Sequence, residues 1–123
     1  MGLHPAMTAM NHWIIGAATG DWTRLIAMLD PAVTFHVPVD GFAGVRHGVA
    51  DAVRFFDWLA ATVRADLVVH TTLTGDSCTA FEARATGVMA GEPFTQRLCL
   101  IFDTRDGLVT GFREYLAWPG GLR

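Results

Sequence analysis

Apolar residues near the start of the chain recur at helical spacing and predict a first helix over about residues 8–18. The residues on its apolar face are Met7, Met10, Trp13, Ile14 and Ala17. After a break at 19–21, Asp21 is a good N-cap for a second helix, which ends before Asp30-Pro31. Two short helices in succession predict a helical hairpin.

The stretch from Thr34 to Phe56 changes pattern within a few residues. A short β-rich run is stopped by Pro38, and a glycine-containing loop with Asp40 follows. An amphipathic helix is then predicted over about residues 49–63. His36 places a polar side chain inside the apolar strand, directly before the loop. This arrangement is typical of the mouth of a pocket.

From residue 65 onward the pattern is that of β-strands separated by Gly-marked turns. Strands are predicted over 67–73, 78–89, 94–103 and 108–117. Strands joined by hairpins must be antiparallel, and the helices need a sheet face to cover. The element order ααβαββββ therefore predicts an α+β fold with one layer of helix against one curved sheet.

Ionisable and polar side chains interrupt the apolar alternation of these strands. Glu82 and Arg84 share one face of their strand, and Gln96 alternates with leucines on the next. Glu114 lies between Phe112 and Leu116 on one face of the last strand. Two interpretations stay open: exposed charges with a weak ion pair, or a pocket in which pKa values are shifted to give acid and base partners.

Composition places the chain among globular proteins. It has 123 residues, 51% hydrophobic and 17% charged, with a formal net charge of −3. This predicts one domain with surplus apolar surface for a cavity or an oligomer interface, and it argues against nucleic-acid binding. The chain has no Lys, which excludes Schiff-base chemistry, and its single Ser, Ser77, lies in a predicted turn.

The sequence shows no signal-peptide profile, no membrane-spanning segment and no metal-ligand spacing of its cysteines. Residues 1–10 lack a signal-peptide profile and no apolar segment reaches membrane-spanning length, so we expect a cytoplasmic protein with no membrane partner. Cys78 and Cys99 have no metal-ligand spacing and are expected to be buried free thiols. We expect no metal and no cofactor. Residues 1–6 are expected to fray from a single domain spanning 1–123.

Several short segments together resemble the SnoaL-like group of the nuclear-transport-factor-like superfamily. These segments are Gly20-Asp21-Trp22, Phe35-His36-Val37-Pro38, Gly48 with Ala52-Val53, Ile101-Phe102, Asp106-Gly107-Leu108-Val109 and Phe112-Arg113-Glu114-Tyr115. The resemblance covers nearly the whole chain and implies a cone-shaped α+β fold. That fold hosts isomerases, cyclases, dehydratases, hydrolases and non-catalytic binders, so the resemblance does not select one activity.

The ketosteroid isomerase pattern of this superfamily lacks its catalytic groups here. It requires an acid before the proline, a Tyr on the first helix and an acid on the fourth strand. The matching positions hold Val37, Trp13 and Leu98. Steroid isomerisation by that mechanism is therefore disfavoured.

The limonene epoxide hydrolase pattern matches the last strand best. Its W-R-D-Y-F resembles residues 112–116 and places an aspartate at Glu114. Its Arg-x-Asp falls near Glu82-x-Arg84 with the charges exchanged, while Thr34 and His36 occupy its water-positioning sites. For the SnoaL cyclase pattern, His36 with Glu82 or Glu114 can fill the acid and base roles.

Two hypotheses follow. The first is a cofactor-free acid–base enzyme that acts on a small apolar, polyketide- or terpenoid-like molecule. In it, Glu114 or Glu82 would be the base, Arg84 would orient an anion and His36 would relay a proton. The second is a non-catalytic ligand-binding or dimerisation module with a structural Glu/Arg network in the cone. The enzyme hypothesis predicts that His36, Glu82, Arg84 and Glu114 line one cavity. The expected substrate-binding residues are Trp13, Asp40, Phe56, Gln96, Leu98, Phe112 and Leu116.

The resemblance also implies a homodimer formed through the outer face of the sheet. Phe81, Ala83 and Ala85 share one face of the third predicted strand and are expected to supply a flat apolar patch there.

Overall fold

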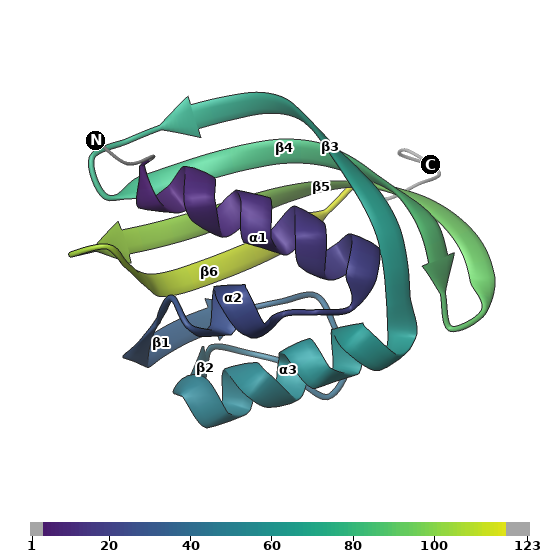
Figure 1. The fold of residues 1–123 in the computed structure, drawn as a ribbon, viewed down its shortest axis with the longest axis horizontal. Helices are drawn as coiled ribbons and strands as arrows, with labels where there is room; N and C mark the ends of the chain where they lie inside the picture. Colours follow the sequence, from purple (N-terminus) through teal and green to yellow (C-terminus); the bar gives the residue numbers. More distant parts are fainter. Residues whose placement is uncertain (1–3, 118–123) are drawn as a thin grey trace.

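Six strands form one curved sheet, and the helices lie on its concave side (Figure 1). The computed structural model describes residues 4–117. Its elements are α1 (Pro5–Thr19), α2 (Thr23–Ile26), β1 (Leu29–His36), β2 (Arg46–His47), α3 (Val49–Thr62), β3 (Val63–Thr74), β4 (Cys78–Met89), β5 (Glu92–Arg105) and β6 (Leu108–Leu116). No helix within residues 4–117 is long and apolar enough to cross a membrane. The predicted α+β fold class is confirmed.

Helix α1 is longer than predicted at its start. Pro5 occupies the first turn, and His4 Nδ1 accepts a hydrogen bond from the Ala6 backbone N–H at 3.1 Å. Ala6 is fully buried, so Pro5 and Ala6 belong to the helix and not to a frayed end. The helix ends at Gly20, whose φ of 82° is the left-handed conformation that glycine adopts readily.

The second helix is shorter than predicted because β1 begins early. Asp21 Oδ1 accepts a hydrogen bond from the Thr23 backbone N–H at 3.0 Å, and α2 then lasts for 4 residues. Leu29 pairs with Val109 of β6, which draws the chain into the sheet. Pro31 falls where the pairing register shifts, a position that tolerates its missing N–H.

The sheet order is β2-β1-β6-β5-β4-β3. Strand β1 runs parallel to β6. The consecutive strands β3 to β6 each pair antiparallel with the next, as the hairpins predicted. The short strand β2 was not predicted, because two polar residues carry no apolar alternation. It pairs with Thr34 and Phe35 of β1 and holds the rim loop against the sheet.

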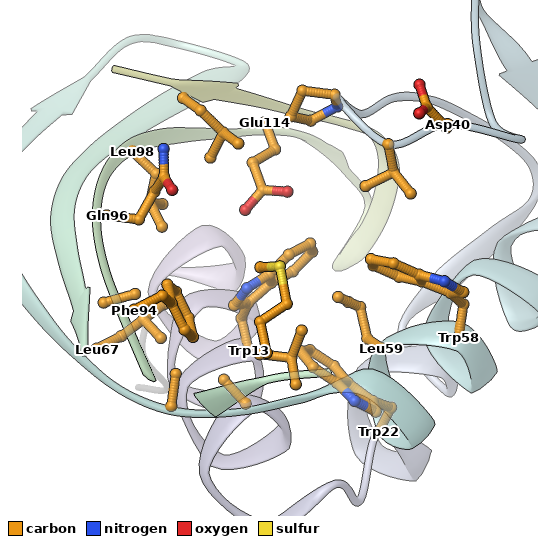
Figure 2. Close-up of a pocket in the computed structure, with 18 residues that line it drawn as sticks. Trp13, Trp22, Asp40, Trp58, Leu59, Leu67, Phe94, Gln96, Leu98 and Glu114 are labelled. Atoms are coloured by element: carbon orange, nitrogen blue, oxygen red, sulfur yellow. The ribbon is translucent and has the colours of Figure 1, made fainter. Parts of the chain in front are cut away.

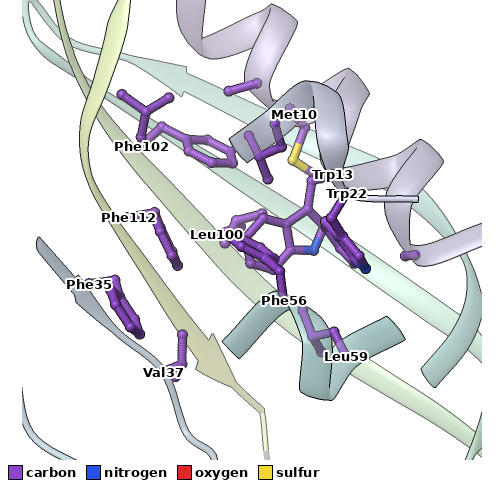
Figure 3. Close-up of a cluster of buried hydrophobic side chains, with 14 of the residues drawn as sticks. Met10, Trp13, Trp22, Phe35, Val37, Phe56, Leu59, Leu100, Phe102 and Phe112 are labelled. Atoms are coloured by element: carbon purple, nitrogen blue, oxygen red, sulfur yellow. The ribbon is translucent and has the colours of Figure 1, made fainter. Parts of the chain in front are cut away.

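A cluster of aromatic rings fills the space between the helices and the concave face of the sheet (Figure 3). Trp13 is its centre: its ring centroid lies 5.2 Å from that of Trp22, 5.6 Å from Phe56, 6.1 Å from Phe102 and 5.8 Å from Phe112. All four contacts are edge-to-face, the geometry that aromatic quadrupoles favour. The core thus ties α1 to both the sheet and α3.

Candidate functional site

A cavity of about 450 Å³ lies between the helices and the concave face of the sheet (Figure 2). Its volume is in the range of pockets that bind small organic molecules. The lining residues come from α1, the turn before α2, α3, the loop after β1 and four strands. They are Trp13, Ala17, Trp22, Pro38, Val39, Asp40, Trp58, Leu59, Val63, Ala65, Leu67, Ala85, Met89, Phe94, Gln96, Leu98, Glu114 and Leu116.

Glu114 projects its carboxyl group from β6 into this cavity (Figure 2). Strand alternation places it on the same face as Phe112 and Leu116, and it pairs in register with the fully buried Leu100. Burial among apolar walls removes water from the charged form and raises the pKa of Glu114 from 4.5 to about 7.

No hydrogen bond or ion pair within residues 4–117 engages the Glu114 carboxyl group. A carboxyl group is costly to bury without a partner, which is why its neutral form is favoured here. A pKa near 7 lets this group both release and accept a proton at neutral pH. The arrangement therefore suits proton transfer to or from a molecule in the cavity.

The desolvated carboxyl group of Glu114 makes a testable contribution to stability. Its pKa is about 7 in the folded protein and 4.5 when unperturbed, so the folded state binds more protons between these values. The free energy of unfolding should therefore fall by about 3 kcal/mol from this group as pH rises from about 4.5 to above 7. Urea unfolding across this range, comparing wild type with Glu114→Gln, measures the effect.

The matched control for this experiment is Glu82→Gln, which makes the same chemical change outside the cavity. The stability of Glu114→Gln relative to wild type should rise across the pH range, whereas that of Glu82→Gln should stay level. Parallel curves for all three proteins would show that Glu114 titrates like an exposed glutamate.

Two further polar residues line the cavity. Gln96 Nε2 donates a hydrogen bond to the Ala117 carbonyl at 3.1 Å, which fixes the amide beside the end of β6. Asp40 lies in the loop after β1, exposed to solvent at the mouth of the cavity. Both positions agree with the sequence-based list of lining residues, as do those of Trp13, Leu98 and Leu116.

Glu82 and Arg84 lie on the outer face of the sheet, outside this cavity. They are exposed, while their neighbours Phe81, Ala83 and Ala85 are buried against the helices. The prediction that Glu82 and Arg84 share a cavity with Glu114 is therefore wrong. So is the expectation that the three apolar residues form an outer patch, since Ala85 lines the cavity itself.

Glu82 instead borders a separate hollow of about 400 Å³ on the outer face, together with Cys99 and Tyr115. Burial, and secondarily the charge of Glu82, raise the pKa of the Cys99 thiol. A thiol in this state is a poor nucleophile. The structural network of Glu82, Arg84 and Glu114 expected inside the cone is not formed among residues 4–117, because Glu82 and Arg84 lie on the outer face of the sheet and Glu114 lies in the cavity.

His36 also lies outside the cavity. Its buried neighbours Phe35 and Val37 face the core, so His36 points to the other side, where its ring centroid is 5.9 Å from that of Tyr115. The expected proton relay between His36 and Glu114 is not formed. The cause is the alternation of β1, which places adjacent residues on opposite faces.

Phe56 and Phe112 belong to the core behind the cavity wall. Both are almost fully buried, and neither is among the lining residues. Phe56 stacks on Trp22 at 5.0 Å between centroids and so supports a residue that does line the cavity. The sequence-based list of lining residues missed Trp22, Trp58 and Phe94. The broad apolar face of α3, which carries Trp58, and the surplus of apolar residues in the chain were the available signals.

Within residues 4–117, no group of three or more His, Cys, Asp or Glu side chains is arranged to hold a metal ion.

The chain belongs to the family of SnoaL-like domains, since the model of that family matches residues 10–112. A comparison with curated protein sequences finds no match. An NTF2-like protein from Anabaena variabilis superposes with a TM-score of 0.89 at 25% identity, covering 98% of this chain and 97% of that one.

Two further solved structures share the fold at lower identity. A proposed isomerase from Rhodopseudomonas palustris has a TM-score of 0.79 at 20% identity, with 94% of this chain and 91% of that one covered. An LEH-like epoxide hydrolase from Mycobacterium tuberculosis has a TM-score of 0.73 at 16% identity, with 92% and 83% covered. At these identities the likeness establishes the fold alone.

Proposed function

We propose that this protein is a cofactor-free enzyme that transfers protons on a small apolar molecule, with Glu114 as its acid–base group. The observation that carries the proposal is the Glu114 carboxyl group, which no residue among 4–117 engages, in an otherwise largely apolar cavity, with a pKa raised to about 7. Such a pKa matches the requirement for general acid–base catalysis at neutral pH. The expected skeleton of the substrate is polyketide- or terpenoid-like, as the family resemblance implies.

The groups around the cavity favour isomerisation, cyclisation by aldol closure or dehydration over epoxide opening. Each of the favoured reactions can proceed with one carboxyl group that takes a proton from carbon and returns one. The epoxide hydrolase pattern needs an arginine between two carboxylates, and no Arg is among the described residues that line the cavity.

A screen in deuterated water tests the proposal directly. Apolar ketones, enones, β-hydroxy ketones and epoxides that fit the cavity are incubated with the protein at neutral pH. We expect deuterium incorporation or double-bond migration in at least one carbonyl class, detected by mass spectrometry and NMR. Diol formation from epoxides without exchange in any carbonyl class would overturn the preference for proton transfer. Binding without turnover in every class would instead indicate a ligand-binding module.

We also propose that the protein works as a cytoplasmic homodimer joined through the outer face of the sheet. Large apolar side chains exposed on this side of the sheet, among them Val68 and Tyr115, support this assembly. Light scattering at micromolar concentration should give twice the chain mass of 13.3 kDa. A monomer mass at the same concentration would contradict it.

A further inference from the structure

The charged groups that line the cavity are all of one sign. Asp40 and Glu114 are its only charged lining residues within the described part of the chain, and no Arg or His lines it. The chain contains no Lys. Four of the described arginine side chains are engaged elsewhere: Arg113 with Asp103, Arg46 and Arg54 with Asp51, and Arg64 with backbone carbonyls. An anionic ligand would therefore meet repulsion at the mouth and no counter-charge from the described residues that line the cavity.

The two carboxyl groups differ in how well they can hold a cation. Asp40 is exposed at the mouth, and no ion pair or side-chain hydrogen bond within residues 4–117 engages it. Because the Asp40 carboxylate is exposed to solvent, pairing with a cation there requires little desolvation. Glu114 is half-buried among apolar walls and holds a proton in a large fraction of molecules at neutral pH. A cation is therefore better placed at Asp40.

The indole of Trp58 lines the cavity on the side where Asp40 lies. Figure 2 shows Trp58 on the same side as Asp40, with Glu114 farther toward Gln96. Trp58 is half-buried in α3 and keeps part of its indole accessible to the cavity. Indole is the aromatic side chain that attracts cations most strongly. A carboxylate and an indole on the same side of one cavity are complementary to an organic ammonium group.

We propose that the substrate of this cavity is an apolar molecule with a protonated amine at its outer end, held at the mouth by Asp40 and the indole of Trp58. This assignment rests on the proposed function, because it takes the cavity as the substrate site and leaves Glu114 free to act on the apolar body. It makes Asp40 and Trp58 determinants of specificity and excludes carboxylates, sulfates and phosphates as substrates.

Three probes with one rigid apolar skeleton test this: 1-adamantylamine, 1-adamantanol and adamantane-1-carboxylate. Their dissociation constants are measured by isothermal titration calorimetry at low salt and about pH 6, where Glu114 is mostly protonated. The amine should bind about two- to fivefold more tightly than the alcohol. The carboxylate should bind more weakly than the alcohol by a similar factor. The preference should shrink as salt screens the mouth.

Asp40→Asn is the decisive variant, since it keeps the shape of the side chain and removes its charge. It should bring the amine and the alcohol to equal affinity while leaving the affinity for the alcohol and the melting temperature unchanged. Glu114→Gln at about pH 6 should keep the amine preference, because this residue carries little charge there.

The assignment would be overturned if wild type bound the carboxylate probe as tightly as the amine, or more tightly. An amine preference that survives in Asp40→Asn would overturn it too. These outcomes leave the proposed function standing if Glu114→Gln abolishes proton transfer in the screen. Conversely, an amine preference that depends on Asp40, together with full turnover in Glu114→Gln, would refute the role of Glu114 in catalysis and keep the ligand assignment.

Discussion

Glu114→Gln should lower kcat/KM by about 10²–10⁴-fold on the substrate that the screen identifies, the usual contribution of a positioned acid–base group. Glutamine matches the size of glutamate but cannot take up or release a proton. The loss should be severe because the other carboxyl group that lines the cavity, Asp40, lies at the exposed mouth. The apolar walls remain intact, so KM should change little while kcat falls.

Two controls separate a chemical effect from a structural one. Glu82→Gln, on the outer face of the sheet, should retain wild-type turnover. The melting temperature of Glu114→Gln at about pH 8 should equal or exceed that of wild type, because the buried charge is gone. A kcat/KM for Glu114→Gln within about threefold of wild type would clear this residue of any role in proton transfer.

Phe112→Ala should reduce the free energy of unfolding by about 3–5 kcal/mol, the usual cost of deleting a fully buried phenylalanine ring. Phe112 is 1% exposed and stacks on Phe35 at 5.0 Å between centroids. It also contacts Trp13 at 5.8 Å and Phe56 at 5.5 Å, so one ring joins the parallel strands β1 and β6 to helices α1 and α3. The resulting void cannot close without moving several of these elements.

Phe94→Ala is the matched control, because Phe94 is half-buried and part of its surface faces the cavity. Its removal enlarges a space that already exists, so the loss measured by urea unfolding should be clearly smaller than for Phe112→Ala. Equal losses for the two variants would show that the ring cluster is not the main stabilising core.

The order of the elements could be predicted from local pattern. The hairpin strands β3 to β6 alternate apolar and polar residues and are separated by turns with Gly75, Gly91 and Gly107, so their antiparallel pairing follows from sequence. The short strand β2 could not be predicted in this way. Its two residues are held in the sheet by pairing with β1, an interaction between segments that local periodicity does not record.

The candidate site shows where alternation alone is insufficient. Period-two spacing correctly groups Glu82 with Arg84 on one face and Phe81 with Ala83 on the other. Which face meets the helices depends on the packing of the whole strand. The more apolar face, with Phe81, is the one that is buried, and this signal was available in the sequence. For His36, the apolar residues on either side of it already indicated an outward direction.

Glu114 is the candidate catalytic residue for which sequence and structure agree on placement. Between Phe112 and Leu116 it shares the apolar face, and the structure places it in the cavity. Trp13 was assigned to the cavity from sequence, but the other two indoles that line it, Trp22 and Trp58, were not, because they come from a turn and from a separate helix. Their convergence depends on how the helices pack on the sheet.

The pKa of Glu114 tests the central claim most directly. Carbon-13 NMR of the glutamate side-chain carboxyl carbons, followed across pH and assigned by the signal that disappears in Glu114→Gln, reads this value in the intact protein. The account predicts a titration midpoint of about 7. A midpoint near 4.5, the unperturbed value, would mean that the carboxyl group is solvated and would contradict its role as an acid–base group in an apolar cavity.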